Sequence, residues 1–393
     1  MTTSPSLDGK SALFSPLTLR GLTLPNRVVI SPMCQYSAHD GLANDWHLVH
    51  LGKFALGGAG TIIVEATAVS EEGRISAADI GLWDDSQIAP LRRVTDFLKQ
   101  HGSVPAIQIG HAGRKGSSQR PWHGNGPLTE QDLAHGDTAW QTVSASAIPV
   151  AEGWPTPVEL TAQDIERICM NFRDAASRAL AAGFEVVEIH AAHGYLLHQF
   201  LSPIANQRTD AFGGSRENRM RFALMVAEAV RSVWPENLPV FARISAVDGI
   251  IQDGIDQGWS LDDSFVFTQA LKELGIDVID CSSGGIGGAM TAARVKRDLG
   301  FQVPFATEVR RTVDIPTIAV GLIIDPDQAN DIVASGRADL IAIGREALYN
   351  PFWPLHAQRH LTASADRTYD DWSEQYGWWL DRRQFILDSI EKG

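Results

Sequence analysis

One pattern of apolar and polar positions recurs along most of the chain. Each unit has an apolar run of strand length, a loop, and a helical stretch whose apolar residues share one face. The apolar runs are Arg27–Cys34, Thr61–Ala68, Ala106–Gly110, Val186–Ala191, Val240–Ser245, Val278–Ser282, Thr317–Gly321 and Leu340–Gly344. Strands that alternate with helices predict parallel pairing through right-handed crossovers. Their near-continuous apolar character predicts burial on both faces of the sheet.

Eight such units in roughly 320 residues favour a (β/α)8 TIM barrel, an α/β fold. The competing architecture is an open, doubly wound sheet, but the first strand-to-helix turn lacks the glycine-rich dinucleotide fingerprint. We therefore predict a single domain over residues 1–393, with the barrel at about 27–360. An N-terminal hairpin is expected before it, because Leu13 to Val28 alternates apolar and turn residues around Arg20-Gly21.

Two long segments interrupt the repeat, Lys115 to Leu160 after the third strand and Leu196 to Gly214 after the fourth. Both leave from the carboxyl ends of strands, so both are expected to cover the face of the barrel where active sites form. Long loops in compact domains are commonly functional. We call residues 115–160 the capping insertion and residues 361–393, which follow the last barrel helix, the C-terminal arm.

Composition limits the classes of function. Of the 393 residues, 44% are hydrophobic and 20% are charged, which is ordinary for a globular chain. The net charge of −14 argues against nucleic acid or an anionic membrane as a partner. We expect neither secretion nor membrane insertion, because no leader pattern or membrane-length apolar stretch is present. Three widely spaced cysteines offer no disulfide framework and fit the cytoplasm, the predicted location.

The strand within Phe184–Tyr195 ends in three side chains that handle protons, His190, His193 and Tyr195. A His-x-x-His pair is also compatible with a metal site, or with satisfied polar residues under a loop. The other strand ends offer mainly Cys34, Gln108, Arg243 and Arg345. Two of these are arginines, which would repel a cation but attract a phosphate or an electron-rich ring. Recognition of an anion and a carbonyl group is therefore favoured over a metal.

The last two strands carry a second signal. Gly321 and Gly344 stand at their carboxyl ends, and Arg345 follows directly, where a helical stretch begins. Loops at this position form the usual phosphate site of the barrel fold, together with a helix N-terminus. Either glycine alone would equally fit a tight turn. Together with Arg345 they favour a phosphorylated cofactor on the barrel mouth, beside the histidines.

Five motifs carry a resemblance to a known family. They are Ser31-Pro-Met-Cys34, Ile109-Gly-His-Ala-Gly-Arg114, His190-Ala-Ala-His-Gly-Tyr195, Arg208-Thr-Asp-Ala-Phe-Gly-Gly-Ser-Arg-Glu-Asn-Arg219 and Gly344-Arg345. With these motifs in this order, the chain resembles the Old Yellow Enzyme family of FMN-dependent ene-reductases from Leu13 to about His360. Cys34, Tyr36 and His193 are similar to the residues of its thermophilic-like branch.

The resemblance implies non-covalent FMN and a role for each matching residue. The residues implied in cofactor binding are Ser31, Pro32, Met33, Cys34, Ala66, Gln108, Arg243, Gly321, Gly344 and Arg345. Gln108 and Arg243 would face the pyrimidine edge of the flavin, where positive charge stabilises the anionic reduced form. The residues implied in substrate binding are Tyr36, His190, His193 and Tyr195.

The resemblance also implies a reaction. NADPH or NADH would reduce FMN, and an α,β-unsaturated ketone, aldehyde, maleimide or nitroalkene would then bind in the same place, giving ping-pong kinetics. His190 and His193 would polarise the carbonyl group for hydride transfer from flavin N5, and Tyr195 would protonate the α-carbon. Cys34 would tune the flavin and would not act as a covalent nucleophile, because no acyl-transfer pattern accompanies it.

The C-terminal arm departs from the family pattern. The branch commonly ends in Gln-Tyr-x-Arg, whose arginine enters a neighbouring subunit, whereas here Gly377, Trp378 and Trp379 follow Tyr376. We expect a homodimer or homotetramer in which Trp378 or Trp379 reaches a partner's substrate pocket. The alternative is that both tryptophans pack on their own barrel.

Two other classes of function stay open at this point. A catalytically silent, flavin-binding redox sensor would share the binding residues, because binding alone does not demonstrate turnover. A zinc-dependent hydrolase on a TIM barrel would use the two histidines as ligands. The residues His190, His193 and Tyr195 together favour the ene-reductase.

Overall fold

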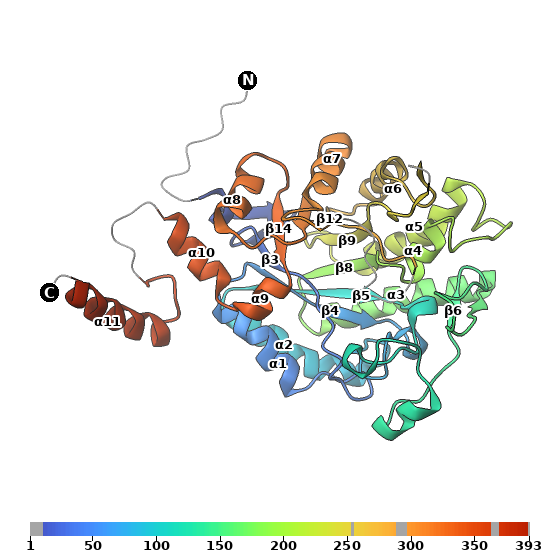
Figure 1. The fold of residues 1–393 in the computed structure, drawn as a ribbon, viewed down its shortest axis with the longest axis horizontal. Helices are drawn as coiled ribbons and strands as arrows, with labels where there is room; N and C mark the ends of the chain where they lie inside the picture. The colour runs from blue at the N-terminus through green and yellow to red at the C-terminus, as the bar shows by residue number, and fades with distance from the viewer. Residues whose placement is uncertain (1–10, 253–254, 288–296, 363–368, 392–393) are drawn as a thin grey trace.

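A closed barrel of parallel strands forms the centre of the molecule (Figure 1). The computed structural model describes residues 11–252, 255–287, 297–362 and 369–391. In barrel order the strands are β12 (Val278–Ser282), β13 (Thr317–Val320), β14 (Leu340–Ile343), β3 (Val28–Ile30), β4 (Thr61–Ala68), β5 (Val104–Gly110), β8 (Val186–Ala191) and β9 (Val240–Ser245). Parallel pairing of β9 with β12 closes the ring. The predicted (β/α)8 barrel is confirmed.

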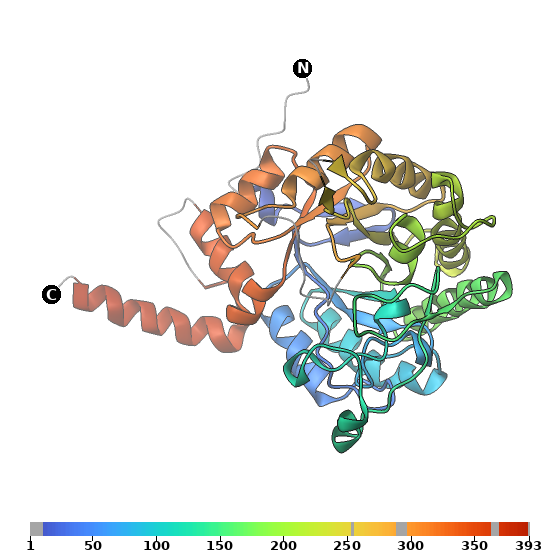
Figure 2. The ribbon, with the colours of Figure 1, turned by 45° about the vertical axis from the view of Figure 1, so that its right-hand side comes forward.

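Helices surround the barrel and bury the outer faces of its strands (Figure 2). They are α1 (Asp45–Leu56), α2 (Ile88–Gln100), α3 (Ala162–Ala181), α5 (Arg216–Val233), α6 (Leu261–Glu273), α7 (Val303–Val313), α8 (Pro326–Ala334) and α10 (Trp353–Leu361). Two short helices, α4 (Leu196–Leu201) and α9 (Arg345–Tyr349), follow the ends of β8 and β14. Within the described ranges, no helix combines the length and apolar character needed to cross a bilayer.

Local sequence determines where these helices begin. At the start of α3, the Thr161 side chain accepts a hydrogen bond from the Asp164 backbone N–H, and the Asp164 side chain bonds back to Thr161. This reciprocal capping satisfies two donors that an uncapped helix would leave without partners. The same arrangement at Ser260 and Asp263 begins α6. Both capped starts are predictable from the sequence.

The predicted hairpin is present and closes the amino-terminal end of the barrel. It consists of β1 (Leu17–Leu19) and β2 (Leu22–Leu24), paired antiparallel. Leu19 and Leu24 pack into the same apolar cluster as the interior side chains of the barrel strands. The hairpin therefore keeps water out of the end of the barrel that has no active-site loops.

The barrel interior changes from apolar to polar along the strands. Alternate residues of a strand share one face, so each strand sends every second side chain inward. The interior apolar cluster includes Ala106, Val186, Phe241 and Val278. Two positions further along the same strands lie Gln108, Glu188, Arg243 and Asp280, all buried. A polar layer therefore lies above an apolar floor, next to the mouth.

The capping insertion and the C-terminal arm lie outside the barrel. The insertion contains short 3-10 turns and a two-stranded sheet, β6 (Val143–Ser144) with β7 (Val158–Glu159). The arm carries α11 (Glu374–Glu391), which projects away from the barrel in both views (Figures 1 and 2). Large apolar side chains are exposed on this helix, namely Tyr376, Trp378, Trp379, Phe385, Ile386, Leu387 and Ile390.

Candidate active site

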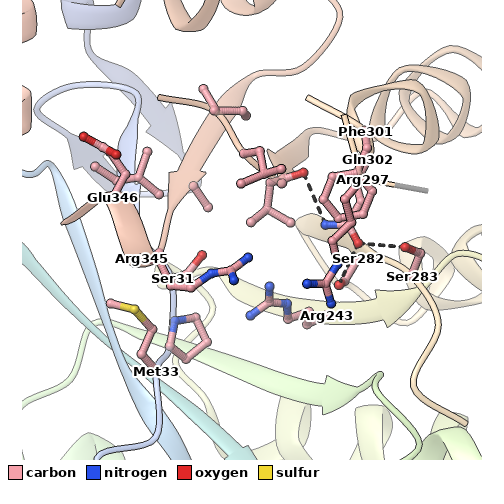
Figure 3. A pocket seen from close by; sticks show the side chains of 18 of the residues that line it. Ser31, Met33, Arg243, Ser282, Ser283, Arg297, Phe301, Gln302, Arg345 and Glu346 are labelled. Carbon is pink, nitrogen blue, oxygen red and sulfur yellow. Dashed lines mark hydrogen bonds between the residues drawn. The ribbon is translucent and has the colours of Figure 1, made fainter. Parts of the chain in front are cut away.

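A cavity of about 340 Å³ lies at the carboxyl ends of the strands (Figure 3). This volume is within the usual range for cofactor and ligand sites. The residues predicted to bind the cofactor that line it are Ser31, Pro32, Met33, Arg243, Gly321, Gly344 and Arg345. The other three, Cys34, Ala66 and Gln108, lie outside this lining. The structure therefore brings most of the predicted cofactor site together from both ends of the chain.

One end of the cavity is suited to a phosphate group. Gly321 has a φ of 117°, and a Cβ there would lie 2.9 Å from the Phe301 ring and 3.1 Å from Gln302 Nε2. Glycine is therefore required for both conformation and space. Arg345 and Arg297 both line the cavity (Figure 3), so two positive charges are available to an anion.

The wall toward the barrel interior presents Arg243, which is 7% exposed. Its Nε lies 3.1 Å from Asp280 Oδ2 but has no hydrogen-bond partner among the described residues. A buried guanidinium group with an unused donor is costly unless a ligand completes its hydrogen bonds. Next to this wall, Gln108 Nε2 donates to Glu188 Oε1 at 2.8 Å. These residues fit an oxygen-rich or anionic group such as the flavin pyrimidine edge.

His190 is held in one protonation state and one orientation. Burial, and then the charge of Arg243, hold its pKa well below the usual value, so the ring is neutral at pH 7. Its Nδ1 accepts a hydrogen bond from the Ala192 backbone N–H at 3.3 Å, so the proton is on Nε2. The ring lies perpendicular to that of His193, with centroids 5.2 Å apart.

His193 is fixed at its backbone and its side chain. Its φ is 58°, an unusual value for a residue other than glycine. Its N–H donates to Ser245 Oγ, and its carbonyl oxygen accepts from Lys115 Nζ at 2.8 Å. On the ring, Nε2 lies 2.6 Å from Ser282 Oγ. Because Ser282 occupies Nε2, Nδ1 is the ring nitrogen left for a ligand.

Tyr195 belongs to a second cluster, on the other side of His190. It is buried with Tyr36, Ile75, Ala78 and Ala112, and its ring centroid is 4.9 Å from that of His190. Burial, and then nearby Cys34 and Asp79, raise the pKa of Tyr195 well above its ordinary value. The phenol therefore keeps its proton at pH 7 and is available as an acid.

Cys34 and Ala66 pack against this second cluster. Burial, and then the negative charges of Asp79 and Glu65, raise the pKa of the Cys34 thiol well above its usual value. A protonated thiol is a poor nucleophile, which argues against covalent catalysis at this position. Tyr36 lies at the same place with its ring 5.9 Å from that of Trp122, an exposed residue of the capping insertion.

Trp378 and Trp379 are not brought to the site within one chain. They lie on α11 with exposed fractions of 53% and 68%, and their rings contact each other at 4.6 Å. By contrast, Trp372 stacks on Phe352 at 5.3 Å, so it packs on its own chain. The alternative that Trp378 and Trp379 bury themselves on their own barrel finds no support in these contacts.

Several cavity residues were not singled out from the sequence. Ser282, Ser283, Arg297 and Gln302 line the cavity, and Ser283 Oγ donates to Gln302 Oε1 at 2.7 Å. Ser282-Ser-Gly-Gly285 at the end of a strand is a signal that would have found the serines. Trp122 and Lys115 come from the capping insertion, where no periodicity marks them. Among the described residues, no group of three or more metal-ligating side chains is clustered.

Comparisons with known proteins agree with this geometry. Residues 12–364 match the NADH:flavin oxidoreductase / NADH oxidase family. An NADPH dehydrogenase of Geobacillus thermodenitrificans is 45% identical over 353 residues, covering 89% of this chain and 95% of the relative. A morphinone reductase structure in complex with tetrahydroNAD is 28% identical with a TM-score of 0.72, covering 89% of this chain and 91% of that one.

A 2-naphthoyl-CoA reductase structure has a TM-score of 0.76 at 23% identity, covering 87% of this chain and 51% of that one, so this likeness carries the fold alone. The family match and the 45% identical relative go further. They confirm the predicted resemblance to the Old Yellow Enzyme family, with FMN as cofactor and a nicotinamide nucleotide as electron donor. The chain therefore belongs to the NADH:flavin oxidoreductase / NADH oxidase family and is an NAD(P)H-dependent flavin oxidoreductase.

Proposed function

We propose that this flavin oxidoreductase reduces the C=C bond of activated alkenes, namely enones, enals, maleimides and nitroalkenes. The observation that carries the proposal is the cluster of His190, His193 and Tyr195 beside the cofactor cavity, since it joins two hydrogen-bond donors to one acid. NADPH or NADH and the alkene would bind in turn at the same place, which gives ping-pong kinetics.

The residues that would hold FMN are Ser31, Pro32, Met33, Cys34, Ala66, Gln108, Arg243, Gly321, Gly344 and Arg345. The bound cofactor supplies hydride transfer between the nicotinamide and the alkene. Arg243 would stabilise negative charge at the pyrimidine edge, and Arg345 would bind the phosphate. The Nε of Arg243, which has no hydrogen-bond partner in the described part of the chain, and the space beside Gly321 support this assignment.

His190 and His193 would donate hydrogen bonds to the substrate carbonyl or nitro oxygen. His190 does so through Nε2, whose proton is fixed by the bond at Nδ1. His193 would donate through Nδ1, which requires its Nε2 to accept the Ser282 hydroxyl proton. Ser282 Oγ also lies 3.2 Å from Gln302 Oε1, but Ser283 Oγ donates to that oxygen at 2.7 Å, so the Ser282 proton would go to the closer histidine nitrogen. Two donors in place before the reaction stabilise the charge that develops on the oxygen.

Tyr195 would deliver the proton to the α-carbon. Its raised pKa keeps the phenol protonated through the physiological range, and the enolate that forms beside it is a strong base. The neighbouring Cys34 keeps its proton for the same reason, so it shapes the site without covalent bonding to the substrate. Trp122, which contacts Tyr36, would limit the size of the alkene from the outside.

The exposed face of α11 supports a homodimer or homotetramer. A projecting helix with several exposed large apolar side chains is unfavourable in water unless another surface covers it. A second copy of the chain supplies such a surface, with Trp378 or Trp379 reaching toward the partner's substrate pocket. Each aromatic side chain would then remove about 150–250 Å² from water and favour flat substrates.

The first test is anaerobic. Purified protein should show flavin absorption bands near about 370 and 450 nm, as expected of an oxidised flavoprotein. NADPH should bleach the 450 nm band, and cyclohexenone added without oxygen should restore it as the saturated ketone forms. Bleaching by NADPH with no recovery on adding any activated alkene would instead support the silent redox sensor. Activity that follows bound zinc in a colourless protein would support the hydrolase.

The second prediction concerns His190 and His193, the two proposed donors to the substrate carbonyl group, which we call the carbonyl clamp. His190→Ala with His193→Ala should leave FMN bound but slow the oxidative half-reaction on the order of a hundredfold or more, because two donors to the developing oxyanion are lost. Stopped-flow measurement of both half-reactions checks this, with His39→Ala as an exposed control. Flavin reduction by NADPH should suffer less. Wild-type rates in both half-reactions would show that the clamp is misassigned.

The third prediction separates proton transfer from hydride transfer. Tyr195→Phe should slow the reduction of cyclohexenone strongly and spare nitroalkenes more, since a nitronate is stable enough to leave and take its proton from water. Tyr36→Phe removes a hydroxyl group from the same cluster and should not distinguish the two substrate classes. Steady-state rates with both alkenes give the answer. Equal losses in Tyr195→Phe would mean that this residue only shapes the pocket.

The fourth prediction concerns the arm. Truncation after Ser373 removes α11 but keeps Trp372, which packs on Phe352. The shortened chain should keep FMN, form a smaller assembly, and show a higher KM for small enones but not for NADPH. Trp378→Ala with Trp379→Ala should raise the same KM with less effect on assembly. Unchanged sedimentation and unchanged KM values in the truncated protein would contradict the crossing of α11 between subunits.

A further inference from the structure

Four buried polar side chains form a layer beneath the cavity. Gln108, Glu188, Arg243 and Asp280 come from β5, β8, β9 and β12, which are consecutive strands of the barrel. Gln108 is paired in register with Glu188, and Arg243 with Asp280. Of the four, Arg243 lines the cavity, whereas the two carboxyl groups are behind it. The proposed function assigns a role to Gln108 and Arg243 but none to Glu188 or Asp280.

The charges in this layer do not balance if every group is ionised. Glu188 and Asp280 are both 0% exposed, and Arg243 is the cation that faces them. One guanidinium group compensates one carboxylate, and a second bare negative charge at this depth is costly. Two acids whose charges repel each other in this way commonly take up one proton in total, so that one is neutral and the other is ionised.

Contacts indicate which carboxyl group holds the proton. Asp280 Oδ2 lies 3.1 Å from Arg243 Nε, and the Asp280 oxygens have no hydrogen-bond partner among the described residues. The ion pair with Arg243 is therefore what stabilises a negative charge on Asp280. Glu188 accepts from Gln108, an uncharged donor, and its Oε2 has no hydrogen-bond partner in the same part of the chain. Burial, and then the charge of Asp280, raise the pKa of Glu188 to about 8. Burial also raises the pKa of Asp280, but the charge of Arg243 opposes that rise.

We propose that Glu188 and Asp280 are positioning residues that share one proton and set the charge under the bound flavin. Asp280 is ionised and neutralises Arg243, and Glu188 is a neutral acid that orients Gln108. The inference rests on the proposed cofactor site, because Arg243 and Gln108 act on FMN only if FMN binds there. Nothing in the family match or the relatives' names assigns a role to these two carboxyl groups.

The consequence concerns the ease of flavin reduction. Hydride uptake brings two electrons and one proton, so the reduced cofactor carries one more negative charge than the oxidised form when it takes up no further proton. An uncompensated Arg243 would attract that charge strongly and make the reduced cofactor a weaker hydride donor. The charge of Asp280 offsets this attraction, so the reduced cofactor stays reactive toward the alkene.

Two isosteric substitutions test the proposal in the FMN-loaded enzyme. Asp280→Asn removes the negative charge beside Arg243, whereas Glu188→Gln replaces a neutral acid with a neutral amide and keeps a carbonyl oxygen for Gln108 to bond. Asp280→Asn should increase the preference of the site for reduced over oxidised FMN about tenfold or more, which raises the midpoint potential by about 30 mV for a two-electron couple. Glu188→Gln should shift the potential much less. Equal shifts, or no shift in either variant, would overturn the proposal.

A second measurement does not depend on the folding of Asp280→Asn. The infrared difference spectrum of wild type minus Glu188→Gln should contain the carbonyl band of a protonated carboxylic acid, which deuterium exchange shifts. The bands of an ionised carboxylate in its place would overturn the proposal. A wild-type protein that cannot be loaded with FMN would contradict the proposed function itself, whereas a yellow enzyme with equal potentials in both variants would contradict only the inference.

Discussion

Side chains inside a closed barrel cannot turn outward to reach water, and the rest of this structure depends on that constraint. The lower interior is filled by apolar residues such as Val186, Phe241 and Val278, with the hairpin packed beneath them. The first inward-facing positions that can be polar lie two residues further along each strand, next to the mouth. At that level a bound ligand can supply hydrogen bonds that the barrel itself does not. Glu188, Arg243 and Asp280 occupy this level, so the site is built directly on a rigid apolar floor.

The constraint also explains why the fold was predictable. Strands buried on both faces are apolar throughout, and the helices between them carry capping pairs such as Thr161 and Asp164, so strand and helix patterns both point to one architecture. The ends of the strands were predicted less accurately than the strands themselves. The apolar run Arg27–Cys34 forms a strand only over Val28–Ile30, because Ser31 N–H makes the last ladder bond, to Ile343, and Pro32 has no N–H to donate. The projecting helix α11 was not predicted, since its exposed apolar side chains follow no buried stripe.

Most site residues on strands could be predicted from the sequence, whereas several site residues outside the strands could not. His190, Gln108 and Arg243 stand on strands, and the position of a residue at a strand's carboxyl end was enough to bring them together. Ser283, Arg297 and Gln302 follow β12 in the chain and line the cavity, but no periodicity in the sequence marks them. The bonding state of His193 was equally hidden, because it depends on Ser282, which is 89 residues away in the chain.

The capping insertion begins at the buried Lys115, which we call its root, and carries the exposed Trp122 at what we call its tip. The two parts make different contacts. At the root, Lys115 Nζ bonds the carbonyl oxygens of His193 and Gly285, and Arg114 Nη2 bonds that of Ile286 at 2.7 Å. Burial, and then the charge of Arg114, lower the pKa of Lys115 to about 7, because a positive charge is unfavourable at this buried position against the His193 backbone. The tip carries Trp122, which contacts Tyr36 from outside. If the proposed function holds, changes at the tip should alter which alkenes fit without disturbing the two histidine donors.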